Sequence, residues 1–309
     1  MRYSILKVQF SILVACLLLL VASYTEAAKL YLEPAEGNYQ PGDTFLVEIK
    51  IDTEGECINT VEANLSFSQN ILKAVDFSQG NSILTLWVNP PSIDQQSRLI
   101  SFVGGIPGGY CGRVPGDPGV SNLLGKIIFR IPGMMVGEPG ENLAEVKFLD
   151  TSQVLLNDGF GTKAKLTTQG AIFKILSEPG TLKDEWQEVI EEDNIPPEPF
   201  KIEVHQEPLI FEGKYFIIFS TTDKQTGLDY YEVKEGEREW KEVESPYLLE
   251  DQALQSIIKV RAVDKAGNER IAEYVPPVKP KPFPYWIIIL ILIVAVGIWW
   301  LMRKLKSKR

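Results

Sequence analysis

The chain has 309 residues, a formal net charge of −10, three cysteines and one histidine. This acidic balance argues against nucleic-acid binding, which requires Lys and Arg clustered on the binding surface. The scarcity of cysteine and histidine argues against most zinc sites and against histidine-based catalysis. Glycine (24) and proline (20) are plentiful, and strongly periodic helical segments are few, so the composition predicts an all-β fold.

Residues 1–28 have the features of a secretory signal peptide. Arg2 and Lys7 precede the apolar stretch 10–22, and small residues follow it. Two alternatives remain open, namely an uncleaved signal anchor and a lipoprotein signal in which Cys16 carries the lipid. Each of these interpretations predicts that the rest of the chain is exported.

Residues 29–176 contain strand-like segments separated by turns, without helical periodicity between them. In the segment 61–67 apolar residues alternate with Glu62, Asn64 and Ser66, so one face is expected to be buried and the other to face solvent. The other predicted strands are 44–51, 71–77, 83–88, 99–103, 123–131, 143–149 and 171–176. We expect nine strands in two packed antiparallel sheets.

Several stretches of this segment resemble a cohesin domain. They are 39–49, 58–67, 71–80, 98–102, 125–131 and 169–175. The resemblance implies a nine-stranded jelly-roll sandwich related to carbohydrate-binding modules. It also implies a role in binding dockerin modules, which assembles polysaccharide-degrading complexes on bacterial surfaces. Where the family often has Tyr-Asp-Pro after the third strand, this chain has Phe67-Ser68-Gln69.

Cys57 and Cys111 are the cysteines that remain once the signal is removed, and an exported location permits their oxidation. Cys57 directly precedes the strand that ends at 67, and Cys111 follows the strand 99–103. The cohesin resemblance implies that these two strands are antiparallel neighbours. On that basis we expect a disulfide between Cys57 and Cys111.

Residues 104–119 are rich in glycine and proline and are interpreted as a long loop inside the sandwich. Long loops of this kind are often functional, although a solvated connection is the simpler interpretation. The glycines neither lead from a strand into a helix nor end in Gly-Lys-Ser/Thr. No phosphate-binding loop is therefore predicted.

Residues 177–195 are expected to form an acidic linker with a short helix around Trp186 and a solvated carboxylate face. Residues 196–277 contain further strand-like segments, at 200–204, 215–220, 230–233, 257–263 and 272–275. The stretches 223–233 and 258–268, together with Trp240, resemble a bacterial Ig-like or fibronectin-III-like domain. Such domains are usually spacers. The stretch 264–268 is expected to form a tight hairpin turn.

The C-terminal part of the chain predicts a membrane anchor. Residues 278–285 form a Pro-rich stalk, and 286–302 are uncharged and apolar with tryptophans at both ends. The basic tail 303–309 marks the cytoplasmic side. We expect a single-pass protein of the cell membrane with an extracellular ectodomain. A sorting peptidase is a less favoured alternative, because the sequence lacks Leu-Pro-x-Thr-Gly.

Two functions remain open at this point. A protein-docking surface needs a sheet face of mixed polarity, whereas direct glycan binding needs exposed aromatic side chains. The candidate binding residues on the sheet are Glu62, Asn64, Ser66, Ser101, Val103, Glu145 and Lys147. The aromatic candidates are Trp87, Tyr110 and Tyr39, and the Gly-rich loop adds Arg113.

The expected partner is therefore a dockerin-like module or an extracellular glycan. No catalytic constellation is recognisable, and the single histidine, His205, lies in a strand-like stretch of the second domain. We expect no enzyme activity, no cofactor and no metal site.

Overall fold

The computed structural model describes residues 27–68, 71–112, 122–133, 143–176, 181–277 and 286–306. Within these ranges the chain is built mainly of strands, and the α-helices are α2 (Glu185–Glu192) and α3 (Trp286–Lys306). The all-β prediction is confirmed. The signal peptide predicted for 1–28 lies almost wholly outside the described residues, and Ala28 is already the first residue of a strand.

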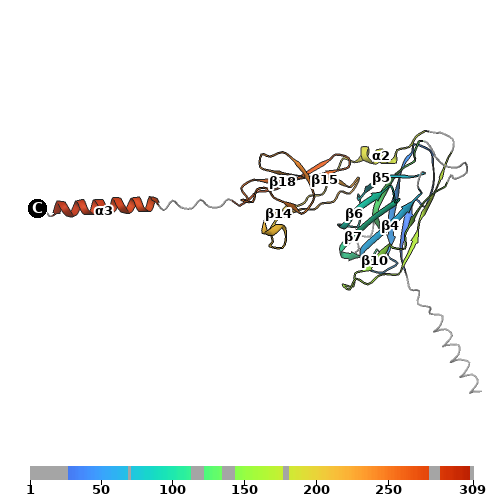
Figure 1. The fold of residues 1–309 in the computed structure, drawn as a ribbon, viewed down its shortest axis with the longest axis horizontal. Coiled ribbons are helices and arrows are strands. Elements are labelled where there is room, and N and C mark those ends of the chain that lie inside the picture. The colour runs from blue at the N-terminus through green and yellow to red at the C-terminus, as the bar shows by residue number, and fades with distance from the viewer. Residues whose placement is uncertain are drawn as a thin grey trace, which may run out of the picture.

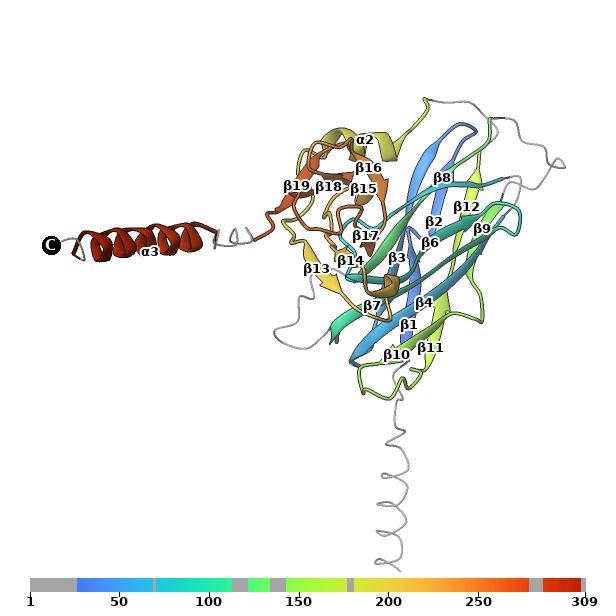
Figure 2. The ribbon, with the colours of Figure 1, turned by 60° about the vertical axis from the view of Figure 1, so that its left-hand side comes forward.

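The larger β domain is a sandwich of two sheets (Figures 1 and 2). One sheet has the order β11-β1-β3-β8-β5. Its strands are β1 (Ala28–Glu33), β3 (Thr44–Asp52), β5 (Lys73–Ser78), β8 (Leu123–Arg130) and β11 (Leu166–Gln169). The pairing of β1 with β11 is parallel, and the other pairs are antiparallel.

The second sheet has the order β2-β12-β9-β4-β7-β6, and β10 also pairs with β4. Its strands are β2 (Glu36–Tyr39), β4 (Ile58–Phe67), β6 (Leu86–Asp94), β7 (Leu99–Tyr110), β9 (Leu143–Phe148), β10 (Gln153–Leu156) and β12 (Ala171–Ile175). The described part of the sandwich therefore has twelve strands, where the sequence predicted nine. The four strands that match none of the segments named from the sequence, β1, β2, β10 and β11, are short, at four to six residues each.

The core of the sandwich lies between the two sheets and follows the strand period of two. On β4, Val61, Ala63 and Leu65 are fully buried, as the alternation predicted, and they join apolar side chains of the opposite sheet. Aromatic rings fill the middle of this core. Phe45 stacks on Tyr39 with 3.8 Å between the ring centroids, and its ring meets Phe173 edge to face.

Two boundaries differ from the prediction for a physical reason. The strand predicted at 83–88 is observed as β6, which runs through Pro90 and Pro91. These prolines are tolerated because β6 is the edge strand of its sheet and its register shifts there. The loop predicted from 104 to 119 begins later, since β7 continues to Tyr110. A Cβ atom at Gly104 would lie 2.5 Å from Leu84 Cδ1, so any larger residue at this position would require the buried Leu84 side chain to move.

The smaller β domain contains two further sheets. One has the order β13-β14-β17 and the other β16-β15-β18-β19. The strands are β13 (Glu203–Gln206), β14 (Tyr215–Ile218), β15 (Leu228–Glu235), β16 (Lys241–Val243), β17 (Tyr247–Leu248), β18 (Ile258–Asp264) and β19 (Glu269–Tyr274). The predicted turn 264–268 joins β18 to β19, with Gly267 at a φ of 87°. Assignment of this domain to the Ig-like class stays a prediction.

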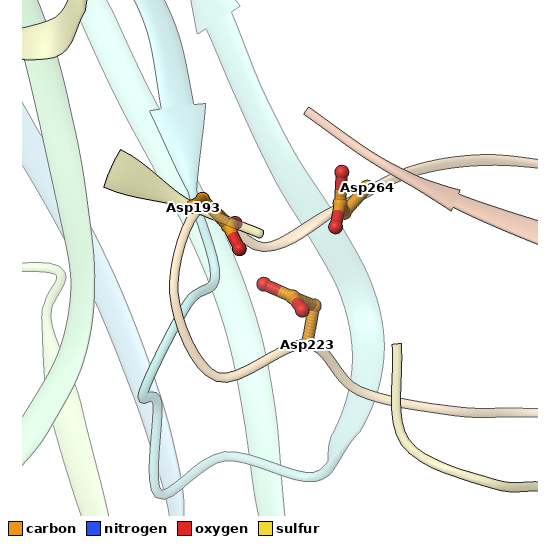
Figure 3. A group of neighbouring side chains, drawn as sticks. All are labelled: Asp193, Asp223 and Asp264. Carbon is orange, nitrogen blue, oxygen red and sulfur yellow. The ribbon is translucent and has the colours of Figure 1, made fainter. Parts of the chain in front are cut away.

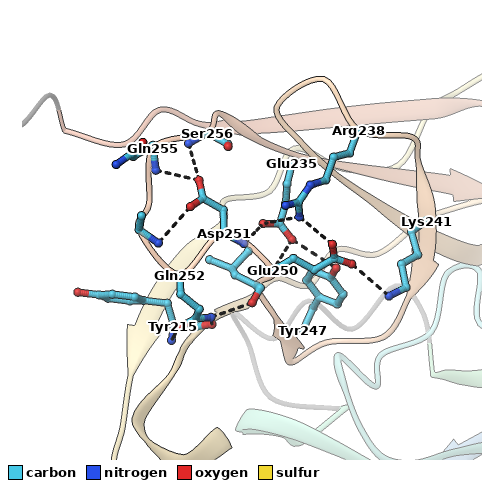
Figure 4. Close-up of polar contacts among 12 residues, drawn as sticks. Tyr215, Glu235, Arg238, Lys241, Tyr247, Glu250, Asp251, Gln252, Gln255 and Ser256 are labelled. Carbon is cyan, nitrogen blue, oxygen red and sulfur yellow. Dashed lines mark hydrogen bonds and ion pairs between the residues drawn. The ribbon is translucent and has the colours of Figure 1, made fainter.

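A buried carboxylate organises one end of the smaller domain (Figure 4). Glu235 accepts hydrogen bonds from the backbone N–H groups of Glu250 (2.9 Å) and Asp251 (2.7 Å). The side chain of Asp251 in turn accepts from the backbone N–H groups of Gln255 and Ser256. These bonds satisfy backbone N–H groups of the loop after β17, which lies outside the strands.

The acidic linker is not simply a solvated connection. Lys183 O accepts a hydrogen bond from Thr44 N on β3 (2.9 Å), and Glu185 Oε2 accepts one from Leu46 N (3.0 Å). The predicted helix is observed as α2, capped by Asp184 Oδ1, which accepts from Gln187 N. Directly after α2, Asp193 is buried. The linker is therefore attached to the sandwich.

Helix α3 covers the predicted anchor and extends into the basic tail as far as Lys306. Among the residues described here, no helix is apolar enough over a sufficient length to cross a membrane. The anchor predicted at 286–302 stays a prediction. The stalk 278–285 and residues 307–309 lie outside the described residues.

Candidate docking face

The outer face of the sheet β2-β12-β9-β4-β7-β6 brings together the sheet residues predicted from the sequence. On β4, Glu62, Asn64 and Ser66 alternate with buried residues and are themselves half-buried. Ser101 and Val103 lie on β7, and Glu145 and Lys147 on β9, each on the solvent side of its strand. We call these seven residues the docking face.

The register of the strands arranges these residues in cross-strand rows. In the first row, Asn64 lies opposite Ser101, and Ser101 lies opposite Ser92 of β6. In the second row, Glu62 lies opposite Val103 on one side and Gln153 of β10 on the other. Side chains directly opposite each other in antiparallel strands are in contact range. The docking face is therefore one continuous surface.

The third row completes the surface toward β9. Ser66 lies opposite Leu99 of β7 and opposite Lys147 of β9. Lys147 Nζ is 3.4 Å from Glu145 Oε2, and both side chains are more than half exposed. An exposed pair of this kind stabilises the fold little, so both groups are available to a partner.

Hydrogen bonds hold the centre of the docking face in place. Glu62 accepts from Asn64 Nδ2 (3.3 Å) and from Gln153 Nε2. The backbone of Asn64 is bound on both sides by Ser152 Oγ, which accepts from Asn64 N (3.0 Å) and donates to Asn64 O (3.1 Å). The central amide and carboxylate are thus pre-oriented, which lowers the entropic cost of binding.

Of the three aromatic candidates for glycan binding, Tyr39 and Tyr110 lie in the core, and Trp87 is partly buried and packs against the core. Trp87 packs edge to face against Phe102, with ring centroids 5.7 Å apart. Tyr110 is 3% exposed and Tyr39 is 8% exposed. Burial raises the pKa of Tyr39 to about 12, and the charges of Glu185 and Asp43 add to this effect. The two tyrosines therefore cannot form an exposed aromatic platform, and a contribution of Trp87 to glycan binding stays a prediction.

The structure joins Cys57 and Cys111 in a disulfide, with an S–S distance of 1.99 Å and a Cα–Cα distance of 4.1 Å. Ile58 lies opposite Tyr110 in the β4–β7 ladder, which places the two cysteines side by side just beyond it. Thr53 Oγ1 also donates to Cys111 O (2.6 Å). Arg113, the loop residue predicted beside this bond, lies outside the described residues.

Sequence reasoning missed three polar residues of this surface. Asn89 and Ser92 come from β6, and Gln153 comes from β10. The prolines at 90 and 91 concealed the extent of β6, and β10 is only four residues long. The alternation of apolar and polar residues in Pro91-Ser92-Ile93-Asp94 was the sequence signal available for β6.

Comparison with known proteins gives a likeness to solved structures alone. No protein-family model matches the chain, and neither does any curated protein. A type I cohesin–dockerin complex from Clostridium thermocellum matches with a TM-score of 0.37 at 16% identity, over 48% of this chain and 93% of that chain. The cohesin module of a family 33 glycoside hydrolase from Clostridium perfringens matches with a TM-score of 0.36 at 15% identity, over 52% of this chain and 100% of that chain.

A type II cohesin domain from the cellulosome of Acetivibrio cellulolyticus matches with a TM-score of 0.32 at 12% identity, over 48% of this chain and 95% of that chain. At these identities and TM-scores the likenesses assign neither a family nor a function to the chain.

Proposed function

We propose that the chain is a cell-surface binding protein whose larger sandwich docks a dockerin-like protein module through the docking face. The observation that carries this proposal is the arrangement of the seven residues, which come from three strands and share one outer sheet face. The resemblance of the sequence to cohesin domains supports the choice of partner.

The chemistry of the face favours a protein over a glycan as the ligand. It offers amide, hydroxyl and carboxylate groups, one cation and the apolar Val103, which is the mixture that protein interfaces use. A glycan platform would need exposed aromatic rings, whereas Tyr39 and Tyr110 are buried in the core and Trp87 is partly buried against it. The proposal assigns the chain a binding role without catalysis.

In this proposal the remaining parts of the chain present the sandwich at the cell surface. The smaller β domain acts as a spacer, the apolar stretch 286–302 anchors the chain in the cell membrane, and the basic tail stays in the cytoplasm. Protease added to intact cells should then remove the sandwich and leave the tail intact. Cleavage of the tail alone would contradict this topology.

The docking proposal is tested with the full chain purified in detergent. Binding to a panel of dockerin modules and of soluble polysaccharides is measured by isothermal titration calorimetry. Ser101→Arg places a large charged group in the first row of the docking face and should weaken dockerin binding at least tenfold. Thr168→Arg makes the matched change at an exposed position of β11 in the other sheet and should leave binding unchanged.

Three results would contradict the proposal. The first is binding to a polysaccharide with no binding to any dockerin module. The second is equal binding by the two arginine variants. The third is release of reducing sugar from a polysaccharide by the purified chain, which would contradict the role without catalysis. Thermal unfolding of each variant checks that a loss of binding is not a loss of fold.

A further inference from the structure

A hollow lies beside the docking face, on the outer side of the same sheet. Its lining includes Leu143 of β9, Ile172 and Lys174 of β12, and Glu36 of β2. Each of these side chains is on the solvent side of its strand. Figure 2 shows the three strands side by side. The hollow has a volume of about 470 Å³, which is within the range of pockets that hold whole small ligands.

Two glycines, Gly37 and Gly170, also line this hollow. Gly170 separates β11, which belongs to one sheet, from β12, which belongs to the other. A Cβ atom at Gly170 would lie 2.4 Å from Val146 O, so a larger residue would displace the backbone of β9. A Cβ atom at Gly37 would lie 2.7 Å from Tyr39 Cε2. Close packing thus opposes a side chain at both positions, and the hollow is not filled from them.

The hollow exposes two aliphatic side chains that lie next to each other. Leu143 is 62% exposed and Ile172 is 51% exposed. Ile172 lies opposite Glu145, and Lys174 lies opposite Leu143. Ile172 and Leu143 are therefore diagonal neighbours on antiparallel strands, close enough for aliphatic side chains to share one surface. Covering this apolar surface would remove it from water, which favours binding.

The hollow also carries one charge of each sign. Glu36 lies opposite Ile172, and Lys174 lies opposite Asn38. Within the described ranges, neither charged side chain forms an ion pair or a hydrogen bond with another residue. Both charges are therefore available to a partner, which would meet them on either side of the apolar surface.

The exposure of the lining favours a protein side chain over a small molecule as the occupant. Pockets for small molecules bury about 70–90% of the surface of their ligand. Here both aliphatic side chains of the lining are more than half exposed, so a small molecule would remain largely in contact with water. A protein bound to the surrounding sheet would cover the hollow and shield a side chain inserted into it.

The size of a protein interface connects the hollow to the docking face. A specific interface comprises about 20–30 residues on each side, and the docking face has only seven. Toward β6 the sheet ends after one further strand, whereas toward β9 it continues into β12 and β2. Glu145 of the docking face lies directly opposite Ile172. An interface of ordinary size on the docking face would therefore reach the hollow.

We propose that this hollow receives an apolar side chain of the same dockerin-like module that binds the docking face, an inference that rests on the proposed function. The inserted side chain would contact Leu143 and Ile172. Charged groups of the module beside it would face Glu36 and Lys174, a cation toward the first and an anion toward the second. The hollow would supply an apolar contact beside a mainly polar docking face, and its two charges would fix the direction in which the module lies.

The experiment uses the full chain in detergent, titrated in the calorimeter with the same panel of dockerin modules. Ile172→Thr keeps the β-branched shape that strands favour and removes part of the apolar contact. It should weaken dockerin binding about fivefold, as expected for truncation of a contact residue inside an interface. Ile271→Thr is the matched control, because Ile271 is also 51% exposed but lies on β19 of the smaller domain. It should leave binding unchanged.

A second variant tests the charge at the hollow. Lys174→Glu should weaken dockerin binding more strongly at low salt than at high salt, because dissolved ions screen the interaction. An effect that is the same at both salt concentrations would overturn the assignment of an anion of the module to Lys174.

The outcomes separate this inference from the docking proposal. Equal binding by Ile172→Thr and Ile271→Thr, while Ser101→Arg weakens binding, would overturn the role of the hollow and leave the docking face in place. Binding to none of the dockerin modules would overturn both. Loss of polysaccharide binding in Ile172→Thr would overturn the module as the occupant and assign the hollow to a glycan. If Ile172→Thr lowers the Tm, Leu143→Thr repeats the test at the other aliphatic residue.

Discussion

Lys265 Nζ lies 2.8 Å from Asp76 Oδ2, which makes an ion pair between the smaller β domain and strand β5 of the sandwich. The Lys265 side chain is 14% exposed, so this pair is better shielded from solvent than an ordinary surface pair. Ser78, two residues further along β5, donates to Thr226 O. The two domains therefore meet through one buried and one partly buried polar contact of defined geometry.

Gly80 should be intolerant of any side chain because of this junction. A Cβ atom there would lie 2.0 Å from Gln225 O, a backbone atom that cannot rotate away. We expect Gly80→Ala to push the two domains apart, which small-angle scattering would record as an increased radius of gyration. Gly133→Ala is the matched control, because a Cβ atom at Gly133 meets nothing within 4 Å. Equal scattering by the two variants would contradict a tight junction.

The disulfide should stabilise the sandwich by restricting the unfolded chain. Its cysteines are 54 residues apart, and the chain-entropy model gives about 4 kcal/mol for a loop of this length. We expect the double variant Cys57→Ser, Cys111→Ser to lose up to this amount of unfolding free energy in urea. Alkylation of the unreduced chain followed by mass spectrometry is the direct check, and modified Cys57 and Cys111 would show that the bond is absent.

Glu235 should be a determinant of stability in the smaller domain. Truncation to alanine leaves the buried N–H groups of Glu250 and Asp251 without an acceptor, which costs about 3 kcal/mol. Glu235→Gln retains one acceptor oxygen and should cost less. The exposed Glu239→Ala should stay within about 0.5 kcal/mol of wild type, and a similar loss in both alanine variants would remove the special role of Glu235.

The same loop should weaken in acid. The side-chain hydrogen bond from Ser256, with backbone N–H bonds from Gln255 and Ser256, lowers the pKa of Asp251 to about 2. An aspartate in the unfolded chain has a pKa of about 3.9, so the unfolded state binds the proton first. The contribution of Asp251 to the free energy of unfolding is complete above about pH 4 and is lost as the pH falls toward about 2.

Hydrogen exchange of the amides at 253–256 between pH 5 and pH 2.5 would measure this effect. In the Asp251→Asn variant the amides at 253–256 should be only weakly protected from exchange even at pH 5, because this variant lacks the carboxylate charge at every pH. Protection in the wild-type chain that is unchanged over this range would contradict the assigned role of the carboxylate.

The sequence was most informative for strands that have one solvent-facing side and one buried side. The alternation from Val61 to Phe67 placed Glu62, Asn64 and Ser66 correctly on the outer surface, because a side-chain period of two admits no other arrangement once one face is buried. It was less informative for Trp87, since an aromatic side chain on an edge strand has the same sequence signature whether it turns outward or packs on Phe102.

The close approach of three buried aspartates, Asp193, Asp223 and Asp264 (Figure 3), could not be predicted from local sequence. Asp193 ends an acidic run that has the composition of a solvated linker, and Asp223 and Asp264 begin turns in which aspartate is common for its own hydrogen bonds. Their approach depends on the packing of three segments against one another. That packing is a property of the tertiary fold, and the spacing of apolar residues along the sequence does not predict it.

Pro90 and Pro91 affect how neighbouring copies of the chain can meet. An edge strand with free N–H and C=O groups is a template on which a second chain can add its own strand, and this is a common route to aggregation. The two prolines remove consecutive donors from the middle of β6, so no continuous ladder can form along this edge. At high protein concentration, neighbouring copies would contact each other at this edge through side chains and would not add a strand to each other's sheets.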